Sequence, residues 1–146
     1  MLPDIIIRDA EPTDIVALTG LMNQLGYPTS VAEMTARMAL IFTHPDYKTI
    51  VAVSNGAVAG MAGLYKGLSY EKNGCYMRIT AFVVDQNQRN QGIGKLLIDA
   101  SEKWAAEQGI NIVVISSRNS EERRAAHAFY QKMGYANRSA GFFKQL

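Results

Sequence analysis

Cysteine and histidine are scarce in this sequence of 146 residues. Cys75 is the only cysteine, which excludes an internal disulfide and any multi-cysteine metal site. The only histidines, His44 and His127, lie far apart in the chain, which argues against a zinc centre. We therefore expect no bound metal.

Long apolar runs and blocks of like charge are also missing. No apolar stretch approaches the roughly 20 residues that span a bilayer, and the start, MLPDIIIRDAEP, has acidic residues where a signal peptide needs a basic segment. The net charge is only +2, and like charges group no further than pairs such as Glu121–Glu122 and Arg123–Arg124. We expect a cytoplasmic protein without a membrane or nucleic-acid partner.

The sequence does contain enough apolar residues for one core. Hydrophobic residues make up 48% and charged residues 19%, proportions typical of a globular protein. No internal repeat, low-complexity segment or linker interrupts the chain. The length and this uniformity predict a single domain over residues 1–146.

The first half of the chain is predicted to form a strand, two helices and three more strands. After a strand at Ile5–Ile7, apolar residues recur at helical spacing up to Gly26. A capping box of Ser30 and Glu33 then predicts a second helix, which ends near His44–Pro45. Between residues 48 and 84, Asn–Gly pairs separate strand-like runs, which predicts a three-stranded antiparallel meander.

The second half continues with helix, strand, helix and strand. The apolar face of residues 93–104 predicts a helix, INIVVIS a buried strand, and residues 120–134 another helix, with closing strands from Tyr135 to Leu146. The expected fold is α+β, with a mixed, mostly antiparallel central sheet flanked by helices on both sides. Its order is strand, helix, helix, three strands, helix, strand, helix, strand.

A glycine-rich junction, QRNQGIG, lies at residues 88–94 where a strand gives way to a helix. Unpaired amides and the positive end of a helix dipole attract phosphate there. A dinucleotide fingerprint needs a third glycine where Leu97 stands, and a P-loop needs glycine where Arg89 stands and Ser or Thr where Leu96 stands. Both of those phosphate motifs are excluded.

Two segments resemble one known family. FVVDQNQRNQGIGKLL closely resembles the acetyl-CoA-binding segment of the GNAT superfamily of N-acetyltransferases, and NSEERRAAHAFYQKMGY is similar to that family's later motif. The resemblance covers essentially the whole chain. It implies an acetyl-CoA-dependent N-acetyltransferase in which acetyl-CoA is the co-substrate.

The resemblance also implies the residues that bind the cofactor. Backbone amides would cradle the pyrophosphate, contributed by Arg89, Asn90, Gln91, Gly92, Ile93, Gly94 and Lys95. The backbone of Phe82 and Val84 would pair with the pantetheine arm as an added strand. Asn119 would hydrogen-bond the same arm, and the roles of Arg123 and Arg124 stay open between phosphate contacts and solvated helix charges.

Tyr130 is the candidate general acid. A phenol with a pKa of about 10 is neutral at pH 7 and can protonate a departing thiolate whose conjugate acid has a pKa of about 8.5. Packing beside Phe129 is the alternative role for this tyrosine. His127, three residues earlier, is expected to be a structural or cofactor-flanking residue. Cys75 has no evident activating base, so transfer should be direct, in a ternary complex.

The proton acceptor departs from the family pattern. Many GNAT relatives carry a glutamate at the position of Thr80, and threonine cannot titrate near neutral pH. Strand alternation predicts that Tyr76, Arg78, Thr80, Phe82 and Val84 share one face, so Arg78 and Thr80 are candidate acceptor-binding residues. Another group or a water would have to serve as base.

The functional interpretation is acetyl transfer to the primary amine of a small molecule or, alternatively, of a protein. The second interpretation is a non-catalytic acetyl-CoA-binding regulatory module, which the missing glutamate at position 80 favours and the presence of Tyr130 opposes. We expect a homodimer. The sequence does not identify the acceptor, although Arg78 would favour an amine that also carries an anionic group.

Overall fold

Five strands form one sheet in the first part of the chain. They are β1 (Ile5–Asp9), β2 (Tyr47–Ser54), β3 (Ala57–Leu68), β4 (Cys75–Val84) and β5 (Val113–Ile115), and they lie side by side in that order. The first four pair antiparallel, and β5 pairs parallel to β4. The predicted mixed, mostly antiparallel sheet and its three-stranded meander are confirmed.

The computed structural model describes residues 4–117, 123–139 and 141–146. The chain divides into two compact units, Met1–Ser116, which contains the five-stranded sheet, and Ser117–Leu146. The prediction of one domain over residues 1–146 stays a prediction.

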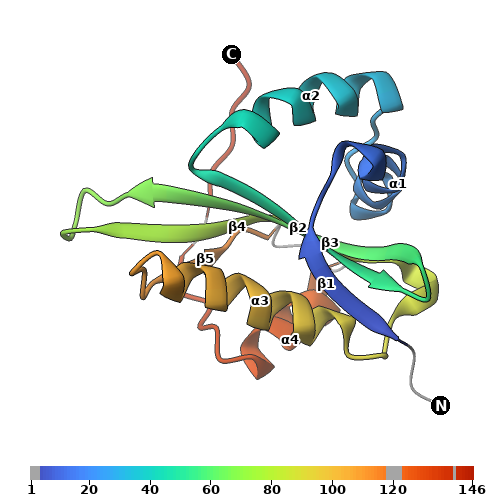
Figure 1. Ribbon diagram of the computed structural model, residues 1–146. Coiled ribbons are helices and arrows are strands. Elements are labelled where there is room, and N and C mark those ends of the chain that lie inside the picture. Colours follow the sequence, from blue (N-terminus) through green and yellow to red (C-terminus); the bar gives the residue numbers. More distant parts are fainter. Residues whose placement is uncertain (1–3, 118–122, 140) are drawn as a thin grey trace. The chain divides into compact units, whose positions relative to one another are not determined.

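Helices cover both faces of the sheet in the first unit. Helices α1 (Ile15–Leu25) and α2 (Val31–Thr43) lie over one face, and α3 (Ile93–Glu107) lies over the other (Figure 1). Two short 3₁₀ helices, η1 (Pro12–Asp14) and η2 (Gln86–Gln88), precede α1 and α3. Within the described chain, no helix is long and apolar enough to cross a bilayer.

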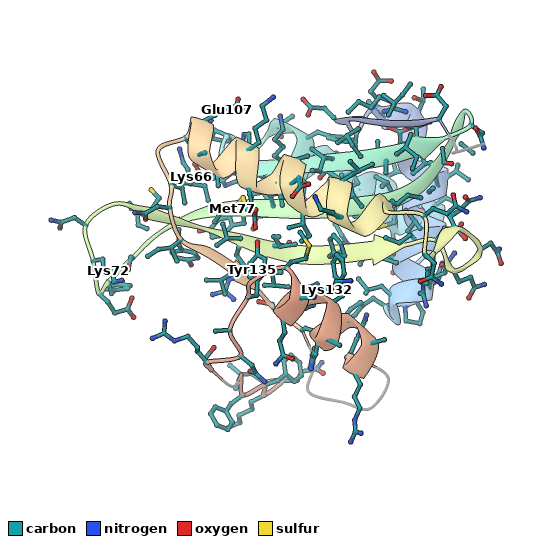
Figure 2. All side chains as sticks on the ribbon, turned by 90° about the horizontal axis from the view of Figure 1, so that it is seen from below. Lys66, Lys72, Met77, Glu107, Lys132 and Tyr135 are labelled. Carbon is teal, nitrogen blue, oxygen red and sulfur yellow. The ribbon has the colours of Figure 1, made fainter. Side chains whose placement is uncertain are left out.

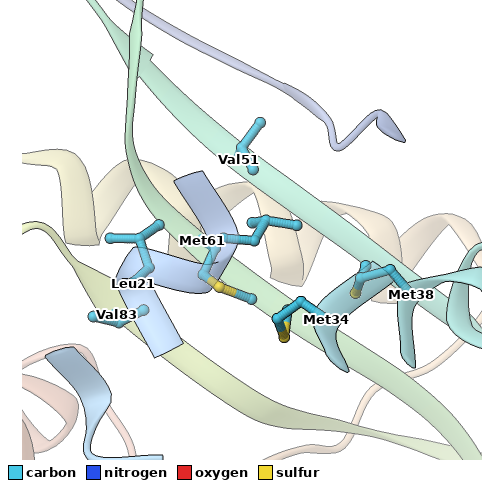
Figure 3. Close-up of a cluster of buried hydrophobic side chains, with 7 residues drawn as sticks. Leu21, Met34, Met38, Val51, Met61 and Val83 are labelled. Atoms are coloured by element: carbon cyan, nitrogen blue, oxygen red, sulfur yellow. The ribbon is translucent and has the colours of Figure 1, made fainter. Parts of the chain in front are cut away.

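The core beneath α1 and α2 joins both helices to the sheet (Figure 3). Its buried side chains are at most 5% exposed and comprise Leu18, Leu21, Met34, Met38, Val51, Met61 and Val83. Three of the seven are methionines, whose flexible side chains fill irregular gaps. This face of the sheet therefore has a methionine-rich core.

The predicted helix and turn residues adopt the predicted local geometry. The Ser30 hydroxyl accepts a hydrogen bond from the Glu33 amide at 3.1 Å, and the Glu33 carboxylate accepts one from the Ser30 amide at 3.0 Å. Asn55 and Gly56 have φ angles of 51° and 84°, the pair of positive angles that a tight hairpin needs. Local sequence thus fixes the start of α2 and the β2–β3 turn.

Gly60 lets α3 approach the sheet closely. A Cβ atom at Gly60 would lie 3.0 Å from Leu97 Cδ1 and 3.2 Å from Ile93 Cγ2, both closer than ordinary contact. Ile93 and Leu97 belong to the first two turns of α3 and are buried. The glycine on β3 therefore sets where the first turn of α3 lies.

The second unit contains helix α4 (Arg124–Lys132), which ends near Gly134 at a φ angle of 97°. The predicted closing strand is not found among residues 135–139 and 141–146. A strand requires a hydrogen-bonded neighbour, and these residues form no ladder. Phe142, Phe143 and Leu146 are almost fully exposed. The predicted helix start at Ser120 lies outside the described residues.

Candidate functional site

A run of seven backbone amides, from Arg89 to Lys95, connects the end of β4 to α3. Among the described residues, none of these seven N–H groups donates a hydrogen bond to another protein group. The amides on either side are different. Those of Gln86 and Asn87 donate to side chains, and the amide of Leu96 donates to the Gly92 carbonyl at 3.2 Å. The run is thus a continuous stretch of available donors at the start of a helix.

Two residues of this run have a left-handed backbone conformation. Asn90 and Gly92 have φ angles of 65° and 81°, in the left-handed region that asparagine tolerates and glycine favours. Gly92 is the N-cap of α3 and, among the described side chains, none caps the helix. Gly94 has no positive φ angle. Only the first of the two predicted glycines therefore supplies an unusual backbone angle.

The segment before the amide run is held in place by side chains. The Asp85 carboxylate accepts a hydrogen bond from the Asn87 amide at 2.8 Å, and the Gln24 side chain of α1 accepts one from the Gln86 amide at 2.9 Å. Arg89 Nε donates to the Val84 carbonyl at 3.4 Å, the longest of these bonds. A structured turn therefore leads into exposed amides.

The two cations of the junction differ in their surroundings. Lys95 Nζ lies 2.9 Å from the Asp99 carboxylate, one helical turn later, in an exposed ion pair. Such pairs contribute little to stability, so the Lys95 ammonium can exchange that partner for another anion. The Arg89 side chain is exposed, and its bond to the Val84 carbonyl directs it toward the end of β4. Both cations raise the local positive charge.

Strand β4 pairs with β5 on its outer edge over three residues, within the part of the chain that the structure describes. Residues Met77–Ile79 pair with β5, and the Ser116 amide donates to the Ile79 carbonyl at 3.3 Å. Beyond Ile79 the parallel ladder to β5 ends, while β4 continues to Val84 beside β3. Phe82 and Val84 lie on this second half of β4, both partly buried.

A β-bulge at Thr80 corrects the predicted arrangement of β4. Ile79 pairs with Leu64 and Ala81 pairs with Gly63, so Thr80 is the extra residue. Its hydroxyl donates to the Gly63 carbonyl at 3.2 Å. A bulge shifts the alternation of side chains between the two sheet faces by one residue. Side chains before and after Thr80 that were predicted to share a face therefore lie on opposite faces.

The pairing register shows which face each half of β4 presents. Arg78 is opposite Tyr65, and Val83 is opposite Met61 in the core beneath α1 and α2. Odd-numbered residues of β3 face α1 and α2, so Arg78 faces these helices, whereas Phe82, opposite Ala62, faces α3. The prediction that Tyr76, Arg78, Phe82 and Val84 share one face is therefore wrong.

Arg78 is engaged by neighbouring side chains. Its Nη1 donates to the Ser116 hydroxyl at 2.6 Å, and its guanidinium lies over the Tyr76 ring, 5.6 Å from the ring centroid. It has no carboxylate partner within 4.0 Å in the described chain, and neither Asp85 nor Glu71 pairs with it. The cation is held between a hydroxyl and an aromatic face.

Arg78 and Thr80 line two different cavities of the first unit. Arg78 lines an open cavity of about 590 Å³ at the far end of the β3–β4 hairpin, whose tip carries Lys72 (Figure 2). Thr80 lines a smaller cavity of about 90 Å³ beneath α1 and α2. The two predicted acceptor-binding residues are thus brought to one sheet face but not to one cavity.

The small cavity is predominantly apolar. Four methionines line it, Met22 from α1, Met34 and Met38 from α2, and Met61 from β3, together with Arg37 at its edge. Sequence reasoning missed this set. The spacing of residues 34, 37, 38 and 41 places one side of α2 toward the sheet and could have indicated Arg37 beside the methionines.

Tyr130 lies on α4 of the second unit and is partly buried. Burial raises the pKa of its phenol above the usual value of about 10, and the positive charge of Arg123 opposes that rise. The Phe129 and Tyr130 ring centroids are 5.9 Å apart in an edge arrangement. Within the same unit, His127 Nε2 lies 3.0 Å from the Ser117 hydroxyl. Asn119 lies outside the described residues.

Comparisons with known proteins agree with these features. The model of the acetyltransferase (GNAT) family matches residues 18–135. An uncharacterized N-acetyltransferase of Bacillus subtilis is 28% identical over 127 residues, covering 86% of this chain and 87% of the relative. The aminoalkylphosphonate N-acetyltransferase of Salmonella typhimurium is 30% identical over 102 residues, 70% of this chain and 65% of the relative. A crystal structure of a GNAT family acetyltransferase from Staphylococcus aureus matches with a TM-score of 0.81 at 32% identity, covering 97% of this chain and 98% of that one.

Proposed function

This chain belongs to the GNAT family of acetyltransferases and is an N-acetyltransferase with acetyl-CoA as donor, and we propose that it acetylates a primary amine of a small molecule by direct transfer in a ternary complex. The observation that carries the proposal is the run of amides from Arg89 to Lys95, for which the described residues provide no well-aligned hydrogen-bond acceptor. Pyrophosphate is the part of acetyl-CoA that needs such donors.

In this proposal the cofactor extends from α3 back along β4. The amides of Arg89 through Lys95 hold the pyrophosphate, with Lys95 and Arg89 adding charge. The pantetheine arm lies along the second half of β4, past Val84 and Phe82, where the ladder to β5 has ended. Asn119 is proposed to hydrogen-bond the same arm. From Val84 to Thr80 the strand rises about 13 Å, at about 3.3 Å per residue, and we propose that the thioester lies at the bulge.

Acetyl transfer then requires a neutral amine, a stabilised oxyanion and a proton for the thiolate of CoA. We propose Tyr130 as the proton donor. Its raised pKa keeps the phenol protonated throughout the neutral range. The ordinary values for a phenol and a thiol differ by about 1.5 pKa units, or about 2 kcal/mol, and the raised pKa of Tyr130 widens this gap, which becomes part of the barrier to transfer. With threonine at position 80, another group or a water accepts the proton of the amine, or the acceptor has a lowered pKa and binds as the neutral amine.

The acceptor is proposed to be a small amine that approaches the bulge at Thr80 from the α1 and α2 side of the sheet. The Salmonella relative is named for aminoalkylphosphonates, which combine an amine with an anion, so these compounds belong in the first acceptor panel. The sequence-based proposal that Arg78 contacts the acceptor is tested in the same panel. The homodimer and the cytoplasmic location stay predictions.

The test is acetyl-CoA turnover over an amine panel with wild type, Tyr130→Phe and Tyr135→Phe. Tyr130→Phe should lower kcat by about ten- to ten-thousand-fold and leave acetyl-CoA affinity nearly unchanged, because only the proton donor is lost. Tyr135→Phe removes the phenol of another partly buried tyrosine of the same unit and should leave kcat within about twofold. Acetyl-CoA binding without turnover of any amine would instead support a regulatory binding module.

A further inference from the structure

We propose that the small cavity lined by Thr80 binds the non-reacting end of the acceptor, and that Arg37 pairs with an anionic group of the acceptor there. The substrate is then a short aliphatic amine that ends in a carboxylate, phosphate or phosphonate. The inference rests on the proposed function, because it takes the reacting thioester to lie at the bulge of β4. It names a specificity residue, Arg37, that the sequence alone did not indicate.

The position of the cavity connects it to the proposed reaction. Thr80 and Ala81, which line it, are the residues at which β4 shifts its register. The proposed pantetheine arm ends at the same place, since it follows β4 from Val84 toward the bulge. An amine that reacts there on the α1 and α2 side has this cavity beside it.

The size of the cavity limits what it can hold. Its volume is about 90 Å³. An engineered apolar cavity of about 150 Å³ in another protein accommodates benzene, so this one is too small for an aromatic ring. A chain of a few methylene groups fits, and the surrounding methionine side chains can adjust to it.

The charge at the edge of the cavity comes from Arg37. Among the described residues that line the cavity, Arg37 is the only charged one. Its Nη1 contacts the Met34 sulfur at 3.1 Å, which holds the guanidinium at the cavity edge but is a weak acceptor. No carboxylate of the described chain lies within 4.0 Å of it. The fork of N–H donors can therefore bind an anion through two parallel bonds.

Arg78 provides an internal comparison. It is also an arginine on this side of the sheet, but it already donates to Ser116 at 2.6 Å, lies over Tyr76, and lines the larger cavity. Its nearest contacts are therefore stronger than the thioether contact of Arg37. The geometry favours Arg37 as the group that selects the acceptor's anion.

The test compares kinetic constants for four matched amines: β-alanine, aminoethylphosphonate, propylamine and diaminopropane. Wild type should prefer β-alanine or aminoethylphosphonate. Arg37→Ala should raise KM for these two by about tenfold, the effect of losing a charge-assisted hydrogen bond at an exposed side chain, and leave propylamine within about twofold. Arg37→Lys should give an intermediate KM for the anionic amines, and Arg78→Ala tests the rival assignment of the anion to Arg78.

Gly63→Ala tests the cavity separately from the charge. A Cβ atom at Gly63 would lie 3.4 Å from the Ala81 Cβ and 3.5 Å from the Thr80 hydroxyl, ordinary contact distances, so the variant should fold. The added methyl group occupies part of the cavity. KM for an anionic amine with one more methylene than β-alanine should rise by about tenfold or more, and by less for β-alanine itself.

Each outcome bears on one proposal. Turnover that is fastest with diaminopropane, or an equal effect of Arg37→Ala on charged and neutral amines, overturns the inference and leaves the proposed function standing. Selective loss in Arg78→Ala but not in Arg37→Ala also overturns it and supports the larger cavity. If wild type binds acetyl-CoA but acetylates none of the four amines or a wider panel, the proposed function fails and the inference fails with it.

Discussion

At Gly92, two substitutions of equal size that differ by one charge can test whether the amides of Arg89–Lys95 bind phosphate. Its φ angle is 81°, at the N-cap of α3, and no atom lies within 4 Å of where a Cβ would be. Space is therefore available for a side chain, and only the backbone angle restricts its type. Asparagine and aspartate tolerate this angle better than other residues. Gly92→Asn and Gly92→Asp have the same shape and differ by one charge.

The expected difference between the two variants follows from Coulomb's law. At an effective dielectric constant of about 20, two unit charges about 6 Å apart repel each other by about 2.8 kcal/mol, a factor of about 100 in Kd. Gly92 is exposed, so water and salt reduce this repulsion. We expect acetyl-CoA to bind Gly92→Asp about tenfold more weakly than Gly92→Asn, with a larger ratio at low salt.

The assay is isothermal titration with acetyl-CoA at two salt concentrations, with the shift in melting temperature as a second measure. Acetyl-CoA, but not NAD or ATP, should raise the melting temperature of wild type and Gly92→Asn by mass action, and raise that of Gly92→Asp much less. Unliganded melting temperatures of the two variants report any difference in folding. Equal Kd values, with no dependence of the ratio on salt, would refute the cradle at Arg89–Lys95.

Three other changes test the fold and the chemistry. Gly60→Ala should lower the free energy of unfolding by about 1–3 kcal/mol, because its Cβ would lie 3.0 Å from Leu97; an unchanged urea midpoint would contradict this packing. Asp14→Asn should cost about 2 kcal/mol at pH 7, since Arg8 holds the pKa of the 6%-exposed Asp14 carboxyl below its usual value. Stability from a lowered carboxyl pKa is present above about pH 4 and is lost as pH falls through the folded pKa. The free energies of unfolding of wild type and Asp14→Asn should therefore become equal in acid. Cys75→Ala should retain most activity, and an acetylated Cys75 formed at the turnover rate would contradict direct transfer.

Short-range sequence patterns predicted most of the first unit. The capping box at Ser30 and Glu33 and the turn at Asn55–Gly56 depend on neighbours within three residues, so the sequence contains all of their determinants. The meander and the two covering helices follow from hydrophobic periodicity. The proposal that the amides from Arg89 to Lys95 bind phosphate came from the family resemblance, because the two glycines alone are also explained by a helix start that needs unusual backbone angles.

The bulge at Thr80 was not predictable in the same way. Neighbouring residues do not require it, since TAFVV reads as an ordinary alternating strand. It arises from pairing with β3, where Gly63 is opposite Ala81 and Leu64 is opposite Ile79. A register shift depends on residues about 16 positions away in the chain. The sequence-based alternation therefore assigned the side chains of β4 after Thr80 to the wrong face of the sheet.

The prediction of a closing strand was wrong for a related reason. Alternating or aromatic residues between Tyr135 and Leu146 indicate strand propensity, but that propensity depends on packing against cross-strand neighbours more than on the backbone itself. Local sequence specifies whether a residue can join a sheet and not which partner it finds. The same limit applies to Arg37, whose place beside the cavity depends on how α2 packs against β2 and β3.

The bulge also explains how one strand can serve two partners of a transfer reaction. Before Thr80, β4 is paired on both edges, with β3 and with β5. After Thr80 the ladder to β5 is gone, and side chains that would have continued toward α1 and α2 turn instead toward α3. In the proposed function the later half offers its backbone edge to the cofactor arm. The bulge itself, with Thr80 and Ala81 at the methionine-lined cavity, faces the acceptor. Because the shift in register sets both positions, a residue deleted from β4 at Thr80 would restore alternation and displace acceptor and cofactor contacts together. Substitutions at Arg37 or Gly92 should affect only one of them.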